Sequence, residues 1–157
     1  MGFINSLKIC FKKYVLISGR ASKSEFWYFA LFFYAVIGII IFIAYQDYKI
    51  ESSNRTEFQS DIFFSIGEIY AWTLMGFILV TILPFIAVTI RRLHDVNQSG
   101  YWLLAALIAP FSMIILPTPI PNIISLILNL IILVLCLKYG DRKDNRFGKN
   151  IYKKNRK

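Results

Sequence analysis

The sequence contains long stretches without a charged residue, and these stretches limit the folds that it can adopt. Residues 26–45 and 69–90 contain no Asp, Glu, Lys or Arg, and two shorter stretches of this kind follow at 101–116 and 120–137. An α-helix rises about 1.5 Å per residue, so about 20 residues cross the roughly 30 Å hydrocarbon core of a bilayer. The pattern therefore predicts an all-α membrane protein with four transmembrane helices.

The composition excludes the other classes of protein that a chain of this length could form. Of the 157 residues, 57% are hydrophobic, and 17% are charged, below the roughly 25% that is usual for soluble proteins. The apolar content excludes disorder, and the presence of only 2 cysteines excludes a disulfide scaffold. We expect residues 1–157 to form a single integral membrane domain.

Three alternating prolines separate the last two predicted spans. Pro117, Pro119 and Pro121 stand where the two charge-free stretches meet, and proline does not continue a helix. The segment is therefore predicted to be a tight turn that joins the two spans into a helical hairpin.

The distribution of basic residues predicts how the chain is oriented in the membrane. With four spans, 16 of the 18 Lys and Arg lie on one side, including the nine of the basic tail at 138–157. Positive charge accumulates in cytoplasmic loops, so both termini are expected to be cytoplasmic. Lys and Arg directly beside a span commonly serve orientation and lipid contact, and we do not expect the tail to bind nucleic acid.

The first 18 residues have the pattern of an amphipathic helix. Phe3, Leu7 and Tyr14 recur at helical spacing, whereas Lys8 and Lys12 lie off this stripe. We do not expect a cleaved signal peptide here, because single apolar residues alternate with lysines. Two interpretations remain open: the helix lies in the headgroup region of the bilayer, or it packs on the protein's own inner face.

Two short polar segments stand beside the predicted spans. Ser22 and Glu25 have the spacing of a capping box that starts the first span. The second span ends in Arg-Arg-Leu-His-Asp at 91–95, which is denser in functional groups than a turn requires. His94 is the only histidine, and no Cys or carboxylate stands near it at metal-ligand spacing. We therefore predict no metal, no cofactor and no catalytic residues.

Three of these segments together resemble a known pattern. They are Gly-Arg-Ala-Ser-Lys-Ser-Glu-Phe-Trp-Tyr-Phe at 19–29, Arg-Arg-Leu-His-Asp at 91–95 followed by Ser-Gly-Tyr-Trp at 99–102, and Asp-Asn-Arg-Phe-Gly at 144–148. The sequence resembles the bacterial inner-membrane family known as domain of unknown function 805. The resemblance implies a small multi-span protein of the bacterial cytoplasmic membrane with an unassigned activity.

All three segments map to the predicted cytoplasmic face, so their polar residues are expected to converge there. Charges at a partly dehydrated interface must pair, so Glu25 and Asp95 should each contact an arginine. The surplus arginine predicts an anionic lipid headgroup, a phosphate-bearing ligand or a protein partner. The predicted site comprises Arg20, Glu25, Arg91, Arg92, His94, Asp95, Asn145 and Arg146.

Two other functions remain open at this point. The protein could be one subunit of an oligomeric transporter or channel, with Thr81, Thr89, Ser112, Ser125 and Asn129 as the polar residues within its spans. An interfacial enzyme that uses His94 with Asp95 is less favoured, because adjacent residues of a helix point about 100° apart. The expected partners are membrane lipids, further copies of the chain, or another membrane protein.

Overall fold

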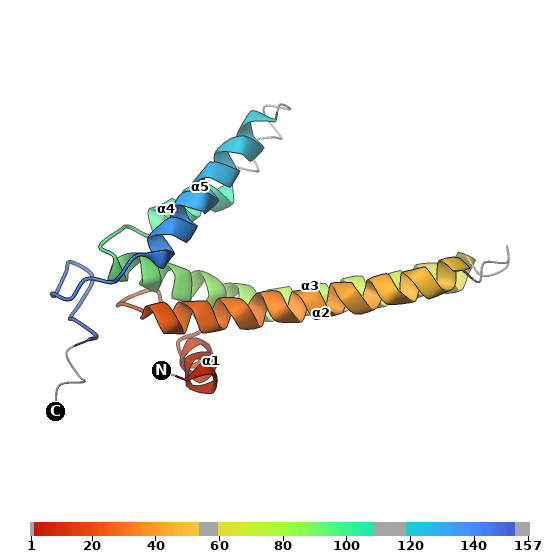
Figure 1. Ribbon diagram of the computed structural model, residues 1–157, viewed down its shortest axis with the longest axis horizontal. Coiled ribbons are helices and arrows are strands. Elements are labelled where there is room, and N and C mark those ends of the chain that lie inside the picture. The colour runs from red at the N-terminus through yellow and green to blue at the C-terminus, as the bar shows by residue number, and fades with distance from the viewer. Residues whose placement is uncertain (1, 54–59, 109–118, 153–157) are drawn as a thin grey trace. The chain divides into compact units, whose positions relative to one another are not determined.

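The described part of the molecule is helical. The structure is a computed structural model that describes residues 2–53, 60–108 and 119–152. Its helices are α1 (Phe3–Lys12), α2 (Lys23–Ser53), α3 (Ser60–Asp95), α4 (Tyr101–Ile108) and α5 (Ile120–Leu137) (Figure 1). Within these ranges the only β-type contact is one isolated bridge between Asn145 and Gly148. The all-α prediction is therefore confirmed.

Within the described ranges, three helices are long and apolar enough to cross a membrane. They cover Lys23–Ile50, Gly67–Asp95 and Ile120–Leu137, with lengths of 28, 29 and 18 residues. They correspond to the first, second and fourth predicted spans. The third predicted span begins as α4, and its remainder lies outside the described residues together with the first two residues of the proline turn, 117 and 118. Four spans therefore stay a prediction.

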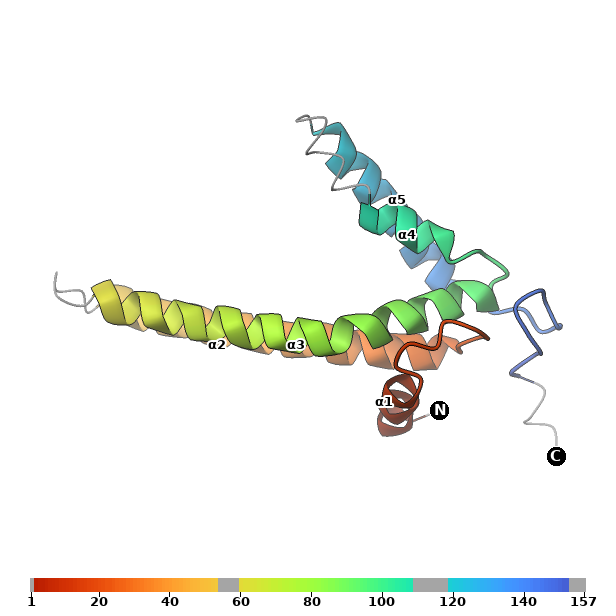
Figure 2. The ribbon, with the colours of Figure 1, turned by 180° about the vertical axis from the view of Figure 1, so that it is seen from behind.

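The chain divides into two compact units, and α2 and α3 contribute to both. One unit contains residues 30–83, and the other contains residues 1–29 and 84–157. In the first unit α2 and α3 run side by side in both views (Figures 1 and 2). The Phe77 ring lies 6.0 Å from Phe32 and 5.9 Å from Phe33, and Tyr70 donates a hydrogen bond to Asp47.

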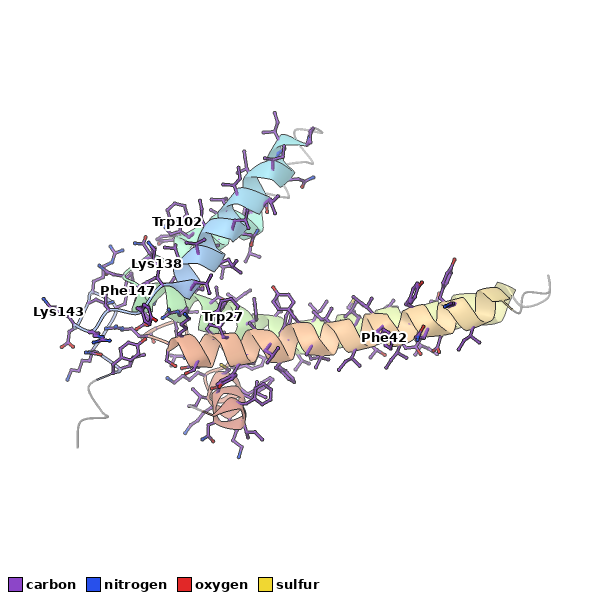
Figure 3. All side chains as sticks on the ribbon, viewed as in Figure 1. Trp27, Phe42, Trp102, Lys138, Lys143 and Phe147 are labelled. Atoms are coloured by element: carbon purple, nitrogen blue, oxygen red, sulfur yellow. The ribbon has the colours of Figure 1, made fainter. Side chains whose placement is uncertain are left out.

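Much of the apolar side-chain surface of the first unit points outward. Leu31, Phe42 and Leu79 are all exposed, and Phe42 projects from α2 in Figure 3. Exposed apolar surface of this extent is typical of helices that lie in lipid rather than in water.

The second unit has a buried core made from segments far apart in the chain. Its fully buried residues include Phe29 of α2, Leu93 of α3 and Cys136 of α5. α4 and α5 pack against each other in both views (Figures 1 and 2), and the Ser125 hydroxyl donates to the Ala106 carbonyl oxygen over 3.2 Å. This arrangement agrees with the predicted hairpin.

The amphipathic segment predicted over residues 1–18 is helical only from Phe3 to Lys12. α1 packs against the beginning of α2 through two edge-to-face ring pairs. The ring centroids of Phe3 and Tyr28 are 5.9 Å apart, and those of Phe11 and Phe29 are 5.6 Å apart. Of the two open interpretations, packing on the protein itself is thus present in the structure.

A buried arginine–carboxylate cluster as the candidate functional site

The segment that leads into α2 brings Arg20 and Glu25 into the interior. Gly19 has a φ of 87°, a left-handed conformation that glycine adopts readily, and the Ala21 amide then donates to the Arg91 carbonyl oxygen over 3.0 Å. The Glu25 amide donates to Ser22 Oγ over 3.2 Å. Ser22 therefore caps α2, which explains why the helix starts at Lys23 rather than at the first residue of the apolar stretch.

Glu25 uses its carboxylate for an ion pair with α3. Arg91 Nη1 lies 2.5 Å from Glu25 Oε1, and both side chains are buried. The capping box predicted from the sequence is thus only half present. Its second half would have turned Glu25 back to the Ser22 amide, but the carboxylate accepts a hydrogen bond from Arg91 instead. A buried arginine without an anion costs more free energy than a helix terminus without its second capping hydrogen bond.

Asp95 is the centre of the larger part of the cluster. Its Oδ1 lies 2.8 Å from Arg20 Nη2, and its Oδ2 lies 2.5 Å from Arg92 Nη1. Tyr152 Oη also donates to Oδ2, over 2.6 Å. All three charged side chains are fully buried. Glu25 and Asp95 therefore each pair with an arginine, as we expected from the sequence.

Arg92 connects the end of α3 to the end of α5. Its Nε and Nη2 each lie 3.2 Å from the Cys136 carbonyl oxygen, and Nη2 also donates to the Lys138 carbonyl oxygen. The last carbonyls of a helix have no partner within the helix and carry partial negative charge. Arg92 therefore satisfies the C-terminus of α5 and Asp95 at the same time.

Arg20 holds the segment that follows α5. Its Nη1 donates to the Lys143 carbonyl oxygen over 2.8 Å, and its Nη2 donates to that of Asp141. The Asp141 amide donates to the Asp95 carbonyl oxygen over 2.8 Å. Figure 3 shows Lys138 at the end of α5 and Lys143 farther along the segment that follows it. The start of the basic tail is thus fastened to the cluster by its backbone.

The remaining predicted residues lie beside the cluster and are not part of its ion pairs. His94 stacks on Phe147 with a ring-centroid distance of 3.9 Å, and its Nδ1 lies 3.2 Å from the Gly19 carbonyl oxygen. Asn145 Nδ2 donates to the His94 carbonyl oxygen over 2.9 Å. The Arg146 guanidinium lies 4.7 Å from the Phe147 ring centroid. These residues hold the tail in place.

The site includes groups that the sequence analysis did not assign to it. Tyr152 donates to Asp95, and Cys10 Sγ lies 4.0 Å from Glu25 Oε1. A Cβ atom at Gly140 would overlap the Asp95 carboxylate. The position of Tyr152 as an aromatic residue within a basic tail could have indicated its role. The sequence contains no signal for the role of Gly140.

The cluster carries more positive than negative charge, and Arg91 has unused hydrogen-bond donors. Among the residues that the structure describes, three buried arginines face two buried carboxylates. Arg91 is fully buried, and its Nε and Nη2 have no hydrogen-bond partner among the described residues. A buried donor without a partner costs about 1–3 kcal/mol, and more when the group is charged. The unpartnered donors distinguish Arg91 from Arg20 and Arg92.

The described side chains around His94 and Asp95 are not arranged as a metal site or as an acid–base pair. Within the described ranges, no group of three His, Cys, Asp or Glu side chains could hold a metal ion. The His94 ring contacts Gly19 and Phe147, whereas the Asp95 carboxylate contacts Arg20, Arg92 and Tyr152. The two adjacent residues thus face different partners.

These features define a helical membrane protein with a buried arginine–carboxylate cluster where α3 and α5 end. The chain belongs to the family described as a protein of unknown function, DUF805, whose model matches residues 14–149. This range includes all three segments on which the resemblance was based.

Two relatives from Escherichia coli strain K12 have a known cellular location. The chain is 36% identical to the inner membrane protein YhaI over 93 residues, or 59% of this chain. It is 32% identical to the inner membrane protein YhaH over 140 residues, or 87% of this chain. The chain spans 63% of the length of YhaI and 88% of that of YhaH. No solved structure matches the chain. The three apolar helices fit insertion into the inner membrane, where both relatives are found.

Proposed function

We propose that this inner-membrane protein binds an anionic phosphate group at Arg91, either on a lipid headgroup or on a soluble ligand. One observation carries the proposal: Arg91 is fully buried, yet two of its three guanidinium nitrogens have no partner among the described residues. An additional anion would accept from both donors and would balance the surplus positive charge.

The free donors of Arg91 are on the edge of the guanidinium that suits a phosphate. Glu25 occupies Nη1, which leaves Nε and Nη2. These two nitrogens donate in parallel from one side of the planar group, and two parallel N–H bonds match two oxygens of one phosphate or carboxylate. Lysine provides no such pair of fixed donors, which explains the choice of arginine at this position.

The distribution of charge supports a cytoplasmic location for this site. Most Lys and Arg residues flank the ends of the spans where the cluster lies, and positive charge favours the cytoplasmic side. We therefore place both termini and the cluster on that side, where anionic headgroups and phosphate-bearing metabolites are both available.

The test compares ligand binding by variants that differ only at the Arg91 pair. In Arg91→Lys the charge that faces Glu25 is retained, and the two parallel donors are lost. In the double variant Glu25→Gln, Arg91→Gln the net charge of the cluster is unchanged, and the guanidinium is removed. Lys149→Gln, at an exposed position of the tail, is the control for loss of a basic residue elsewhere.

Binding is measured by native mass spectrometry of the full chain in detergent, with phosphatidylglycerol, phosphatidylcholine and inorganic phosphate as probes. We expect the wild type and Lys149→Gln to retain phosphatidylglycerol or phosphate, and both Arg91 variants to lose at least tenfold in affinity. Selective retention of phosphatidylglycerol assigns a lipid headgroup, and retention of phosphate alone assigns a soluble ligand. Equal binding by all four proteins would overturn the proposal.

The alternative function, a subunit of an oligomeric transporter or channel, gains no support from the described polar residues of the spans. Thr81 and Thr89 donate to carbonyl oxygens of their own helix, and Asn129 donates to Ser125. The hydroxyl groups of Thr81 and Thr89 are therefore occupied within the protein, whereas Asn129 is exposed and Ser112 lies outside the described residues. Detection of oligomers in the same mass spectra would support this alternative.

A further inference from the structure

A surface at the N-terminus, separate from the arginine–carboxylate cluster, exposes apolar residues in a consecutive run. Val15, Leu16 and Ile17 follow α1 and are 66%, 47% and 53% exposed. Three consecutive exposed apolar side chains are unfavourable in water unless something covers them. This run therefore needs an explanation other than the internal packing of the second unit.

The outward side of α1 continues the same surface and adds positive charge. Ser6 and Cys10 are buried against the protein, whereas Ile4 is 63% exposed. Lys8 and Lys12 are exposed as well, and they follow Ile4 at intervals of four residues, so all three lie along one side of the helix. Apolar and basic side chains together are typical of a helix that lies in the interface of a membrane.

The position of this surface in the chain indicates what contacts it. The run ends at Ile17, and the membrane-length helix α2 begins a few residues later at Lys23. The exposed residues therefore stand at the point where the chain enters the bilayer. Lysines attract anionic lipid headgroups there, while their aliphatic stems and the neighbouring apolar side chains contact the acyl boundary.

We propose that α1 and residues 15–17 form a membrane-contact surface that rests on an anionic lipid bilayer. Ile4, Val15, Leu16 and Ile17 enter the interface, and Lys8 and Lys12 contact headgroups. This inference does not depend on a ligand at Arg91. It also joins the two interpretations of the N-terminal segment, because α1 packs on α2 with one side and faces lipid with the other.

The test measures the depth of spin labels in the full chain, reconstituted into nanodiscs that contain phosphatidylglycerol. Nitroxides are attached to Leu16→Cys, and to Lys149→Cys as the control in the exposed tail, after both native cysteines are replaced by alanine. Collisions with oxygen report lipid exposure, and collisions with a water-soluble nickel chelate report water exposure. The ratio of oxygen to nickel accessibility should be several-fold higher at residue 16 than at residue 149.

Two results would overturn the inference. Equal ratios at both positions would place residue 16 in water. Shelter of residue 16 from both reagents would mean that protein, such as a second copy of the chain, covers the surface. A second measurement uses the unmodified chain in case the cysteine-free protein misfolds. Backbone hydrogen exchange over residues 13–18 should be slower in phosphatidylglycerol nanodiscs than in phosphatidylcholine nanodiscs, and equal rates would contradict the role of anionic lipid.

Discussion

Arg20 and Asp95 form a fully buried ion pair across 75 positions of the sequence, with 2.8 Å between Arg20 Nη2 and Asp95 Oδ1. The pair joins the segment before α2 to the last residue of α3. Because Arg92 and Tyr152 meet the same carboxylate, Asp95 connects three separate parts of the chain. Its environment leads to the first prediction.

Asp95→Asn should strongly destabilise the protein. The substitution leaves the buried charges of Arg20 and Arg92 without their anion, and removal of one partner from a buried ion pair costs about 3–5 kcal/mol. The free energy of unfolding is measured by titration with dodecyl sulfate in mixed micelles, followed by circular dichroism. Asp144→Asn is the control, because Asp144 is exposed and accepts one hydrogen bond from the Asn150 amide. Asp144→Asn should lower the free energy of unfolding by about 1 kcal/mol at most. Equal decreases in both variants would refute this prediction.

Gly140→Ala should destabilise the protein although it adds only one methyl group. A Cβ at this position would overlap the Asp95 carboxylate and lie 2.5 Å from Tyr152 Oη, and overpacking of this kind costs about 1–3 kcal/mol. Gly38→Ala in α2 is the control, because nothing lies within 4 Å of its added Cβ. The control should be neutral or stabilising by up to about 1 kcal/mol, since alanine favours the helix. Similar effects of both substitutions would show that position 140 tolerates a side chain.

Cys10 should react slowly with alkylating reagents in the folded protein. Burial, and to a smaller extent the Glu25 carboxylate, raise the pKa of the Cys10 thiol from its ordinary value of 9.0 to about 12, although the Arg91 guanidinium acts in the opposite direction. Only the thiolate reacts, so iodoacetamide at pH 8 should modify Cys10 much faster in dodecyl sulfate than in the native state. Mass spectrometry of the peptide that contains residue 10 measures both rates, and equal rates would contradict a buried thiol.

The same raised pKa predicts how stability depends on alkaline pH. Above about pH 9 the unfolded chain releases the thiol proton, whereas the folded protein retains it up to about pH 12. The unfolded state then binds fewer protons, so the free energy of unfolding falls as the pH rises through this range. Cys10→Ala should show a shallower fall than the wild type in unfolding titrations between pH 9 and pH 11. An unchanged slope would mean that Cys10 does not contribute.

Ser22→Ala should remove the N-terminal cap of α2. The Glu25 amide would lose its acceptor at Ser22 Oγ, and loss of a serine cap typically costs about 0.5–2 kcal/mol. Ser18→Ala is the matched control, because Ser18 is exposed in the same connecting segment. The two unfolding titrations are compared directly, and a loss confined to Ser22→Ala supports the cap.

Most of the helical architecture could be predicted from local patterns. The apolar stretches at 26–45, 69–90 and 120–137 lie within α2, α3 and α5, because an uncharged apolar run of about 20 residues suits a helix that crosses a bilayer. The helix ends were less accurate. α2 extends past both ends of its apolar stretch, since Ser22 caps it early and the polar residues beyond Tyr45 continue the helix.

The ion pairing inside the cluster was predictable in kind but not in its particular contacts. Pairing of Glu25 and Asp95 with arginines followed from the cost of burying an unpaired charge. The sequence did not show which arginine each would contact. Asp95 contacts both Arg20 and Arg92, and Glu25 contacts Arg91. His94 and Arg146 were assigned to the cluster, but they contact Phe147 beside it.

Local composition was therefore enough to predict membrane-length helices with charges gathered near their ends, because both properties depend on short stretches of sequence and on the thickness of the bilayer. The folded structure was needed to show that two Arg91 nitrogens have no partner among the described residues, that Tyr152 contacts Asp95, and that Gly140 leaves room for the carboxylate. Those features arise where segments distant in the chain converge, and the geometry of such contacts depends on packing that no local pattern specifies.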